Sequence, residues 1–215
     1  FPQYTTEGAK PTSHYIPRFR NVYRQETDFL RGYAAGFGAQ PNRETNKEGF
    51  GAELSNQLLS TKETGIWNVN SHMMGETIPK ESNLVSLDQE KTDAWGIPLL
   101  NIDVDYDGND EKMIQDFYEQ FSEMYEKSGF VNIKTNDNGR RPGNDIHEMG
   151  GVRMGKNPKT SLLNAWNQMH ECKNVFVTDG ACMTSTSTQN PSLTFMAISA
   201  RAANYAIRQM KKGLI

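Results

Sequence analysis

Apolar and polar residues alternate along Leu99–Tyr106. The apolar side carries Leu100, Ile102, Val104 and Tyr106, and the polar side carries Asn101, Asp103 and Asp105. A period of two residues is that of a β-strand with one buried and one wet face, which suits an antiparallel sheet. Asp107-Gly108 then turns the chain, and Asn109 can cap a helix that follows. The segment predicts an α+β fold built on an antiparallel sheet.

A helix over residues 109–128 is predicted by an apolar stripe with steps of four, four and three residues. Its members are Met113, Phe117, Phe121 and Met124, and Gly129 marks its end. Further runs with strand character are Tyr15–Phe19, Phe29–Phe37, Ile66–Met74 and Leu84–Leu87. We therefore expect one sheet of about five or six strands over residues 14–106, with the helix on one of its faces. Residues 38–64 favour an excursion from this sheet, with helical character around Leu54–Leu59.

The last part of the chain, residues 141–215, is expected to form a unit separate from a sheet domain of residues 1–140. It contains a short apolar strand at Val175–Val177. Asn190 stands where an N-cap belongs and Pro191 fits the first position of a helix. That helix is expected to end at Lys211-Lys212-Gly213 and to bury one apolar face. The face consists of Leu193, Met196, Ala197, Ala200, Ala203, Ile207 and Met210.

Composition excludes several classes of protein. The net charge is −3, so a nucleic-acid partner is not indicated. No apolar run reaches the ~20 residues of a membrane helix. The two cysteines, Cys172 and Cys182, form no CxxC and have no nearby histidine pair, so neither a zinc site nor a disulfide framework is expected. The opening FPQYTTEGAK has no initiator Met or targeting segment, so we expect a fragment or a processed product whose compartment stays open.

A dinucleotide-binding fingerprint is absent from the sequence. The pairs Gly36/Gly38 and Gly49/Gly51 lack the third glycine, and neither pair follows a strand and opens a helix. GxSxG, HExxH and Walker motifs are also absent. No other chemistry-bearing motif competes with the pattern in the last seventy or so residues.

Two features of these last residues are ambiguous when each is taken alone. His147 is flanked by Gly150-Gly151, which permits close approach of a ligand, but a histidine beside glycines is also a common structural residue. The helix start at Asn190-Pro191-Ser192 is either a plain capped terminus or an anion site. Neither residue decides the function by itself.

Together, these segments resemble the C-terminal signature of the glucose–methanol–choline (GMC) oxidoreductase family. The matching segments are His147-x-x-Gly-Gly-x-Arg-Met-Gly155, Val175-Phe-Val-Thr-Asp179-Gly180 and Asn190-Pro191-Ser-Leu-Thr194. Upstream, Tyr15-Ile-Pro-Arg-Phe-Arg-Asn21, Phe29-Leu-Arg-Gly-Tyr33 and Trp95-Gly-Ile-Pro98 look like the substrate domain of bacterial sugar-oxidising members. The resemblance covers essentially the whole chain except Gln40–Gly65, and it is to the His/Asn type of the family.

The resemblance implies an FAD-dependent oxidoreductase that oxidises an alcohol group by hydride transfer to flavin N5. By the same resemblance, His147 would be the base and Asn190 would orient the alcohol oxygen. Asp179, Gly180, Pro191, Ser192 and Thr194 would contact FAD, and residues 141–215 would be the return segment of the FAD-binding domain. Because the family's N-terminal glycine-rich motif is missing here, we expect the chain to need the N-terminal half and not to retain FAD alone.

The same resemblance implies a sugar or polyol as the substrate, and aromatic and arginine side chains of the sheet would suit the wall of its pocket. They are Tyr15, Arg18, Tyr33 and Trp67. Two alternatives remain: a non-catalytic carbohydrate-binding module, and a partner subunit without a site. The former predicts that His147 and Asn190 lie far apart. The latter predicts a buried 183–190 loop and a His147 packed in a core.

Overall fold

The computed structural model of the protein describes residues 13–41, 50–60, 67–137, 142–143 and 146–215. Three strands form its main sheet: β1 (Ser13–Phe19), β2 (Tyr33–Pro41) and β3 (Trp67–Gly75). They are antiparallel and lie in the order β1-β2-β3. All three were predicted within a few residues of their ends, and the antiparallel α+β class is confirmed.

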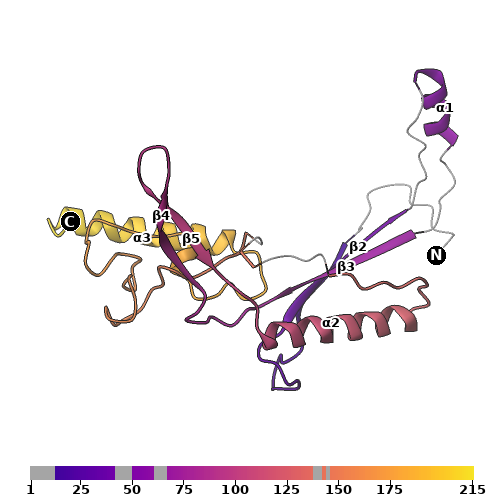
Figure 1. Ribbon diagram of the computed structural model, residues 1–215, viewed down its shortest axis with the longest axis horizontal. Helices are drawn as coiled ribbons and strands as arrows, with labels where there is room; N and C mark the ends of the chain where they lie inside the picture. Colours follow the sequence, from indigo (N-terminus) through magenta and orange to yellow (C-terminus); the bar gives the residue numbers. More distant parts are fainter. Residues whose placement is uncertain (1–12, 42–49, 61–66, 138–141, 144–145) are drawn as a thin grey trace.

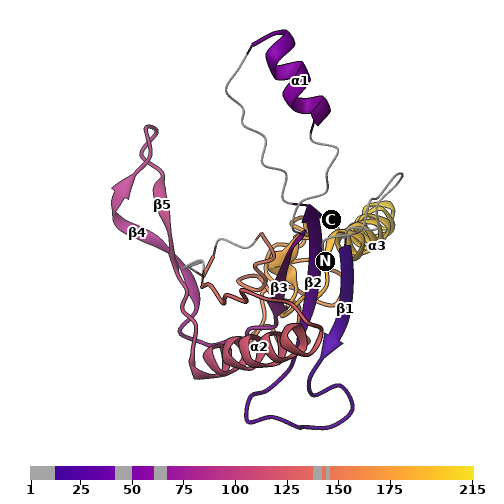
Figure 2. The same cartoon turned by 90° about the vertical axis from the view of Figure 1, so that its right-hand side faces the viewer.

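Helix α2 (Gly108–Lys127) covers one face of this sheet, as predicted (Figure 2). The predicted stripe supplies the contact, because Met113, Phe117 and Phe121 are buried. They pack with Phe29, Tyr33 and Ala35. Phe117 and Phe121 also contact each other with ring centroids 4.4 Å apart. Burying side chains of this size contributes roughly 1.5–3 kcal/mol each.

The start of α2 differs from the prediction in its capping residue. Asp107, not Asn109, is the N-cap, and its carboxylate accepts from the backbone N–H groups of Asn109 and Asp110. The Asp110 carboxylate accepts from the Asp107 N–H in return, completing a capping box. Asn109 instead accepts from the Leu30 N–H at 2.7 Å, so it fastens the β1–β2 connection. At the other end Gly129 has φ 79°, the left-handed geometry expected after a helix.

The remaining strands, β4 (Leu84–Thr92) and β5 (Pro98–Asp103), form a separate two-stranded antiparallel sheet (Figure 1). The prediction of one continuous sheet is therefore wrong. The half-buried face expected on Leu99–Tyr106 is also wrong, since Leu100 is 61% exposed and Ile102 is 58% exposed. Alternation identifies an apolar face, but no described element covers this one. Helix α1 (Ala52–Ser60) lies where helical character was expected.

The C-terminal part contains the short helix η1 (Gly180–Cys182) and the long helix α3 (Ser192–Lys211). The strand expected at Val175–Val177 is reduced to a single bridge between Gln168 and Phe176. Helix α3 ends as predicted, but its predicted apolar face points away from the protein. Its exposed members include Leu193 at 78%, Met196 at 69% and Met210 at 64%.

The opposite side of α3 makes its contacts instead. Tyr205 stacks on Trp166 at 5.0 Å between ring centroids, and Arg201 donates to the buried Asn167 side chain at 3.0 Å. Among the described residues, Ala202 is the buried member of the helix. The apolar stripe left outside is the kind of surface that marks a contact with another part of a protein. No helix within the described ranges has the length and apolar character needed to cross a bilayer.

Candidate active site

The segment that follows His147 runs beside the short helix η1. Backbone N–H groups of Gly150, Val152 and Met154 donate to the carbonyls of Gly180, Ala181 and Cys182. The donor–acceptor distances are 3.4, 3.1 and 3.0 Å. Gly150 and Gly151 have φ of 92° and 80°, a conformation that glycine adopts without strain. The glycine pair therefore lets the chain turn from His147 into this ladder.

Two of the residues predicted to contact FAD also have local structural roles. The Asp179 carboxylate caps η1 by accepting from the Ala181 N–H at 2.9 Å. Gly180 is buried, and a Cβ there would lie 2.9 Å from the carbonyl oxygen of Glu148. Only glycine therefore permits the close packing of residues 148–149 on this turn. Asp179 is exposed, so its outer side stays open to a ligand.

The 183–190 loop is held against the main sheet by side-chain hydrogen bonds. The Tyr15 hydroxyl donates to the Thr188 carbonyl at 3.2 Å, and the Gln189 amide donates to the Pro17 carbonyl at 2.9 Å. At the other side of the sheet, the Ser185 hydroxyl donates to the Glu76 carboxylate at 2.6 Å. The loop therefore crosses the sheet from β1 to the end of β3.

Asn190 follows this loop and is exposed. Pro191 is buried and occupies the N-cap position of α3, which has no side-chain cap. Asn190, which was predicted to be the N-cap, therefore lies one position before the observed N-cap and does not cap the helix. Its amide has no hydrogen-bond partner among the described residues, so the amide is available to a ligand.

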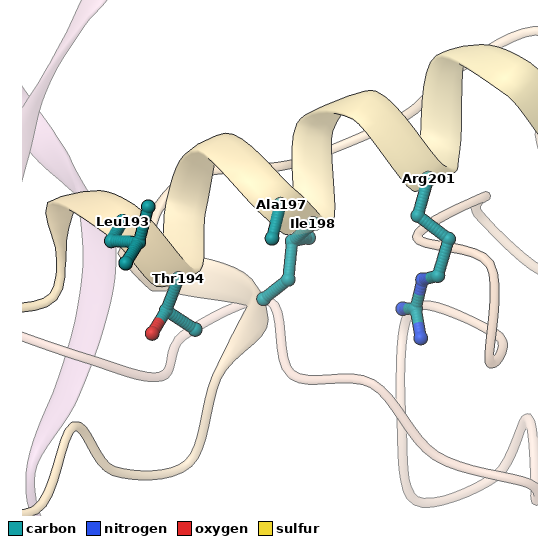
Figure 3. Close-up of a pocket in the computed structure, with 5 residues that line it drawn as sticks. All are labelled: Leu193, Thr194, Ala197, Ile198 and Arg201. Atoms are coloured by element: carbon teal, nitrogen blue, oxygen red, sulfur yellow. The ribbon is translucent and has the colours of Figure 1, made fainter.

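The first turns of α3 bear Ser192 and Thr194, which are both exposed. Thr194 lines an open depression of about 350 Å³ with Leu193, Ala197, Ile198 and Arg201 (Figure 3). In Figure 3 the Thr194 and Arg201 side chains extend to the same side of the helix. Free N–H groups at a helix start carry roughly half a positive charge, which favours an anion.

His147 is partly buried and also has no hydrogen-bond partner within the described ranges. Its segment approaches the 183–190 loop where a Cβ on Gly150 would lie 3.9 Å from the Met183 carbonyl oxygen. Met183 begins the loop that ends at Asn190. The segment that begins at His147 and the loop that ends at Asn190 therefore approach each other at Gly150 and Met183.

The predicted sugar-binding wall is only partly correct. Tyr15 is 44% exposed and lies beside the loop, but Tyr33 is completely buried against α2. Trp67 shares the face of β3 that carries Met73, which packs on the α2 core. Sequence reasoning also passed over His72, because nothing in one strand shows which residues oppose it on the next. The register places His72 opposite Gly36, which is opposite Tyr15.

Comparison with known proteins agrees with the resemblance seen in the motifs. A GMC oxidoreductase family model matches residues 79–199. The 2-methyl-1,2-propanediol dehydrogenase of Mycolicibacterium austroafricanum is 32% identical over 198 residues, which cover 85% of this chain. The fructose dehydrogenase large subunit of Gluconobacter japonicus is 27% identical over 195 residues, 88% of this chain.

A third relative, the paromamine 6'-oxidase of Streptomyces fradiae, is 30% identical over 125 residues, 58% of this chain. The aligned part spans 35% of each of the first two relatives and 23% of the third. The family match covers more than half of the chain and includes every candidate site residue from His147 to Thr194. The chain therefore belongs to the GMC oxidoreductase family.

Proposed function

We propose that this chain is the C-terminal, substrate-facing part of a longer FAD-dependent oxidoreductase that oxidises an alcohol group of a sugar or polyol. The observation that carries the proposal is the placement of Asn190. It lies at the end of a loop fastened to the sheet, it caps no helix, and its amide has no partner in the described part of the chain. The same chain belongs to a family of alcohol oxidoreductases that is in general FAD-dependent.

The residues present fit the flavin end of FAD. The uncapped start of α3 offers N–H groups and positive potential to an electron-rich ring edge, worth ~0.3–2 kcal/mol depending on burial. Pro191, Ser192 and Thr194 would hold that edge, and Asp179 with Gly180 would face the remainder of the cofactor. When bound, FAD supplies the hydride acceptor. The adenine half needs a glycine-rich motif that this sequence lacks, in keeping with a longer protein.

His147 and Asn190 would have different roles in the oxidation of the alcohol. An alcohol carbon becomes a good hydride donor only as the hydroxyl proton leaves, so a base must receive that proton. The His147 imidazole is the side chain that would receive it. Asn190 does not titrate, and its amide would donate to the alcohol oxygen and fix its orientation. The exposed stripe on α3, which contains Leu193 and Met196, would pack against the rest of the FAD-binding domain.

The names of the relatives support a hydroxyl-bearing substrate. They include a diol dehydrogenase and a fructose dehydrogenase subunit. An oxidase named for paromamine is a third case. In this chain, Tyr15 is exposed near the loop, and its hydroxyl oxygen can accept a hydrogen bond from such a molecule.

The test uses the full-length protein loaded with FAD and mixed rapidly with a panel of sugars, polyols and diols. We expect alcohol-dependent bleaching of the flavin. His147→Ala should slow it by about 10²–10⁴ without changing FAD content. His170→Ala is the matched control, since His170 lies in the same unit but pairs with Ser161 at 3.3 Å. Bleaching by no alcohol, or a parent rate in His147→Ala, would contradict the proposal or the base assignment respectively.

A further inference from the structure

A transverse row of residues crosses the face of the main sheet that is turned away from α2. Tyr15, Gly36 and His72 are direct cross-strand partners. Directly opposed residues share a face, and their side chains are neighbours. Met73, adjacent to His72 in β3, packs on the α2 core, so His72 belongs to the other face. His72 is exposed on that face.

The His72 ring lies directly over the backbone of Gly36. A Cβ built on Gly36 would be 2.5 Å from the ring Cε1 and 2.7 Å from Nε2, closer than two such atoms can approach. Glycine therefore allows the imidazole to lie across β2, toward the side of the sheet that holds Tyr15. The imidazole has no hydrogen-bond partner among the described residues. Its polar edge is free to bind a ligand.

This row lies beside the 183–190 loop, with Tyr15 and His72 exposed at its two ends and Gly36 buried between them. The loop contacts β1 at Pro17, whose carbonyl accepts from the Gln189 amide, and Ala34 in the neighbouring strand is completely buried. One level further on, the Tyr15 hydroxyl touches both Thr188 and Gln189. Gln189 immediately precedes Asn190. The row thus leads from the residue next to Asn190 to His72.

The length of the row sets the size of the substrate that can contact both of its ends. Two strand spacings separate β1 from β3, roughly 10 Å, and the His72 ring leans inward over the middle strand. Because this span exceeds the length of a short diol, we expect a small diol held at Asn190 not to contact the imidazole. A sugar or a polyol of five or six carbons would contact it. The row presents a phenol oxygen that can accept a hydrogen bond, since its proton is donated to the loop, and an imidazole that can both donate to and accept from hydroxyl groups.

We propose that His72 is a specificity-determining residue that hydrogen-bonds a hydroxyl of a polyol substrate remote from the carbon being oxidised. The inference rests on the proposed function and deepens it by separating sugars and polyols from short diols. It assigns Gly36 the role of leaving room for the His72 ring over β2.

The experiment compares kcat/KM for hexoses and hexitols with kcat/KM for 2-methyl-1,2-propanediol in the FAD-loaded full-length protein. His72→Ala should lower kcat/KM for the best polyol about tenfold, mainly through KM, the worth of one hydrogen bond. The value for the diol should not change. His72→Gln, which keeps a donor and an acceptor, should recover much of the loss. His14→Ala is the control, because His14 opposes Phe37 on the other face of the same sheet.

Gly36→Ala gives an independent measurement, because the added Cβ must displace the imidazole. It should reproduce the loss on polyols, and the Gly36→Ala/His72→Ala double variant should lose no more than either single variant. Equal losses on polyol and diol, no loss on either, or a parent that oxidises diols but no polyol would each overturn the inference and leave alcohol oxidation standing. A parent protein whose flavin no alcohol reduces would overturn both.

Discussion

The hydroxyl of Tyr15 donates to the carbonyl of Thr188 at 3.2 Å across 173 positions of sequence. The bond joins the first strand of the sheet to the loop that ends at Asn190. The same hydroxyl lies 3.3 Å from the Gln189 side-chain oxygen. Tyr15 is therefore one of the side chains that hold the candidate catalytic loop against the sheet, and the position of Asn190 depends on the sheet.

Tyr15→Phe should loosen this loop while keeping the ring. Thr188 and Gln189 stay attached to the Pro17 carbonyl, so the fold should survive with little change in Tm. Flavin reduction in the full-length protein should slow about 3- to 10-fold, as expected for the loss of one or two weak hydrogen bonds. Rapid mixing of the FAD-loaded protein with the best alcohol substrate measures this rate of flavin reduction. Tyr23→Phe is the control, since Tyr23 is 98% exposed. A parent rate in Tyr15→Phe would show that the contact does not position the loop.

Asp116→Ala should destabilise the sheet–helix unit. The Asp116 carboxylate accepts from the Arg20 guanidinium at 2.9 Å and from the Tyr33 hydroxyl at 2.8 Å. Tyr33 is completely buried, and both its burial and this hydrogen bond raise the pKa of the phenol above its usual value. Removing the carboxylate leaves that hydroxyl without its acceptor, a loss of about 1–3 kcal/mol.

Urea unfolding of the chain, followed by circular dichroism, measures this loss as a lower midpoint. The matched control is Asp28→Ala, which breaks the Lys112–Asp28 pair at 2.8 Å. Both partners of that pair are more than half exposed, so its midpoint should not move measurably. Similar midpoints for the two variants would show that the Asp116 contacts are no more important than a surface ion pair.

The elements that the sequence predicts well are those whose partners lie nearby in the described chain. The apolar stripe of α2 packs on the sheet, where Phe117 contacts Tyr33 and Phe121 contacts Phe37. The same reasoning failed for β5 and α3. Periodicity identifies an apolar face but not whether the covering element belongs to the same stretch of chain. Leu100 and Leu193 are exposed for this reason.

The sequence identified the motifs of the candidate site but not the positions of their residues relative to one another. His147 and Asn190 came from a resemblance, and their positions beside Gly150 and after the docked loop needed the fold. Tyr33 was wrongly assigned to a sugar pocket because the pattern of one strand does not show which of its faces a helix covers, and Tyr33 lies on the face of β2 that packs against α2. Pairing register is set by turns and by the irregularity in β1, which single-strand patterns do not encode.

The two cysteines should differ sharply in reactivity. Cys172 is exposed and Cys182 is 1% exposed, and burial raises the pKa of the Cys182 thiol. A folded-state pKa above the unfolded value of about 8.5 means that the folded protein holds this proton more tightly. The contribution of Cys182 to stability is therefore full below about pH 8.5 and is lost as the pH rises through the folded-state pKa.

A thiol-specific chromogenic disulfide at pH 8 should label one cysteine rapidly and the second only after denaturant is added. Cys172→Ser should remove the rapid phase and keep the slow one. Two rapid phases in the native chain would show that Cys182 is accessible in solution, contrary to its burial.

Asn190→Ala separates a catalytic role from a structural one. A helix cap contributes to stability, so the loss of a true cap lowers Tm. Asn190 makes no cap bond to α3, whereas Asp107 caps α2 through a complete capping box. Thermal unfolding should therefore show an unchanged Tm for Asn190→Ala and a lower Tm for Asp107→Ala, the matched control.

In the full-length protein the same Asn190→Ala substitution should slow flavin reduction by ~10²–10³, the usual worth of one donor aimed at a reacting oxygen. FAD content should not change, because the backbone N–H groups at the start of α3 do not depend on that side chain. Rapid mixing at saturating alcohol measures the chemical step without the binding step. A lower Tm together with a parent reduction rate would reverse the assignment, and Asn190 would then be a structural residue of the loop.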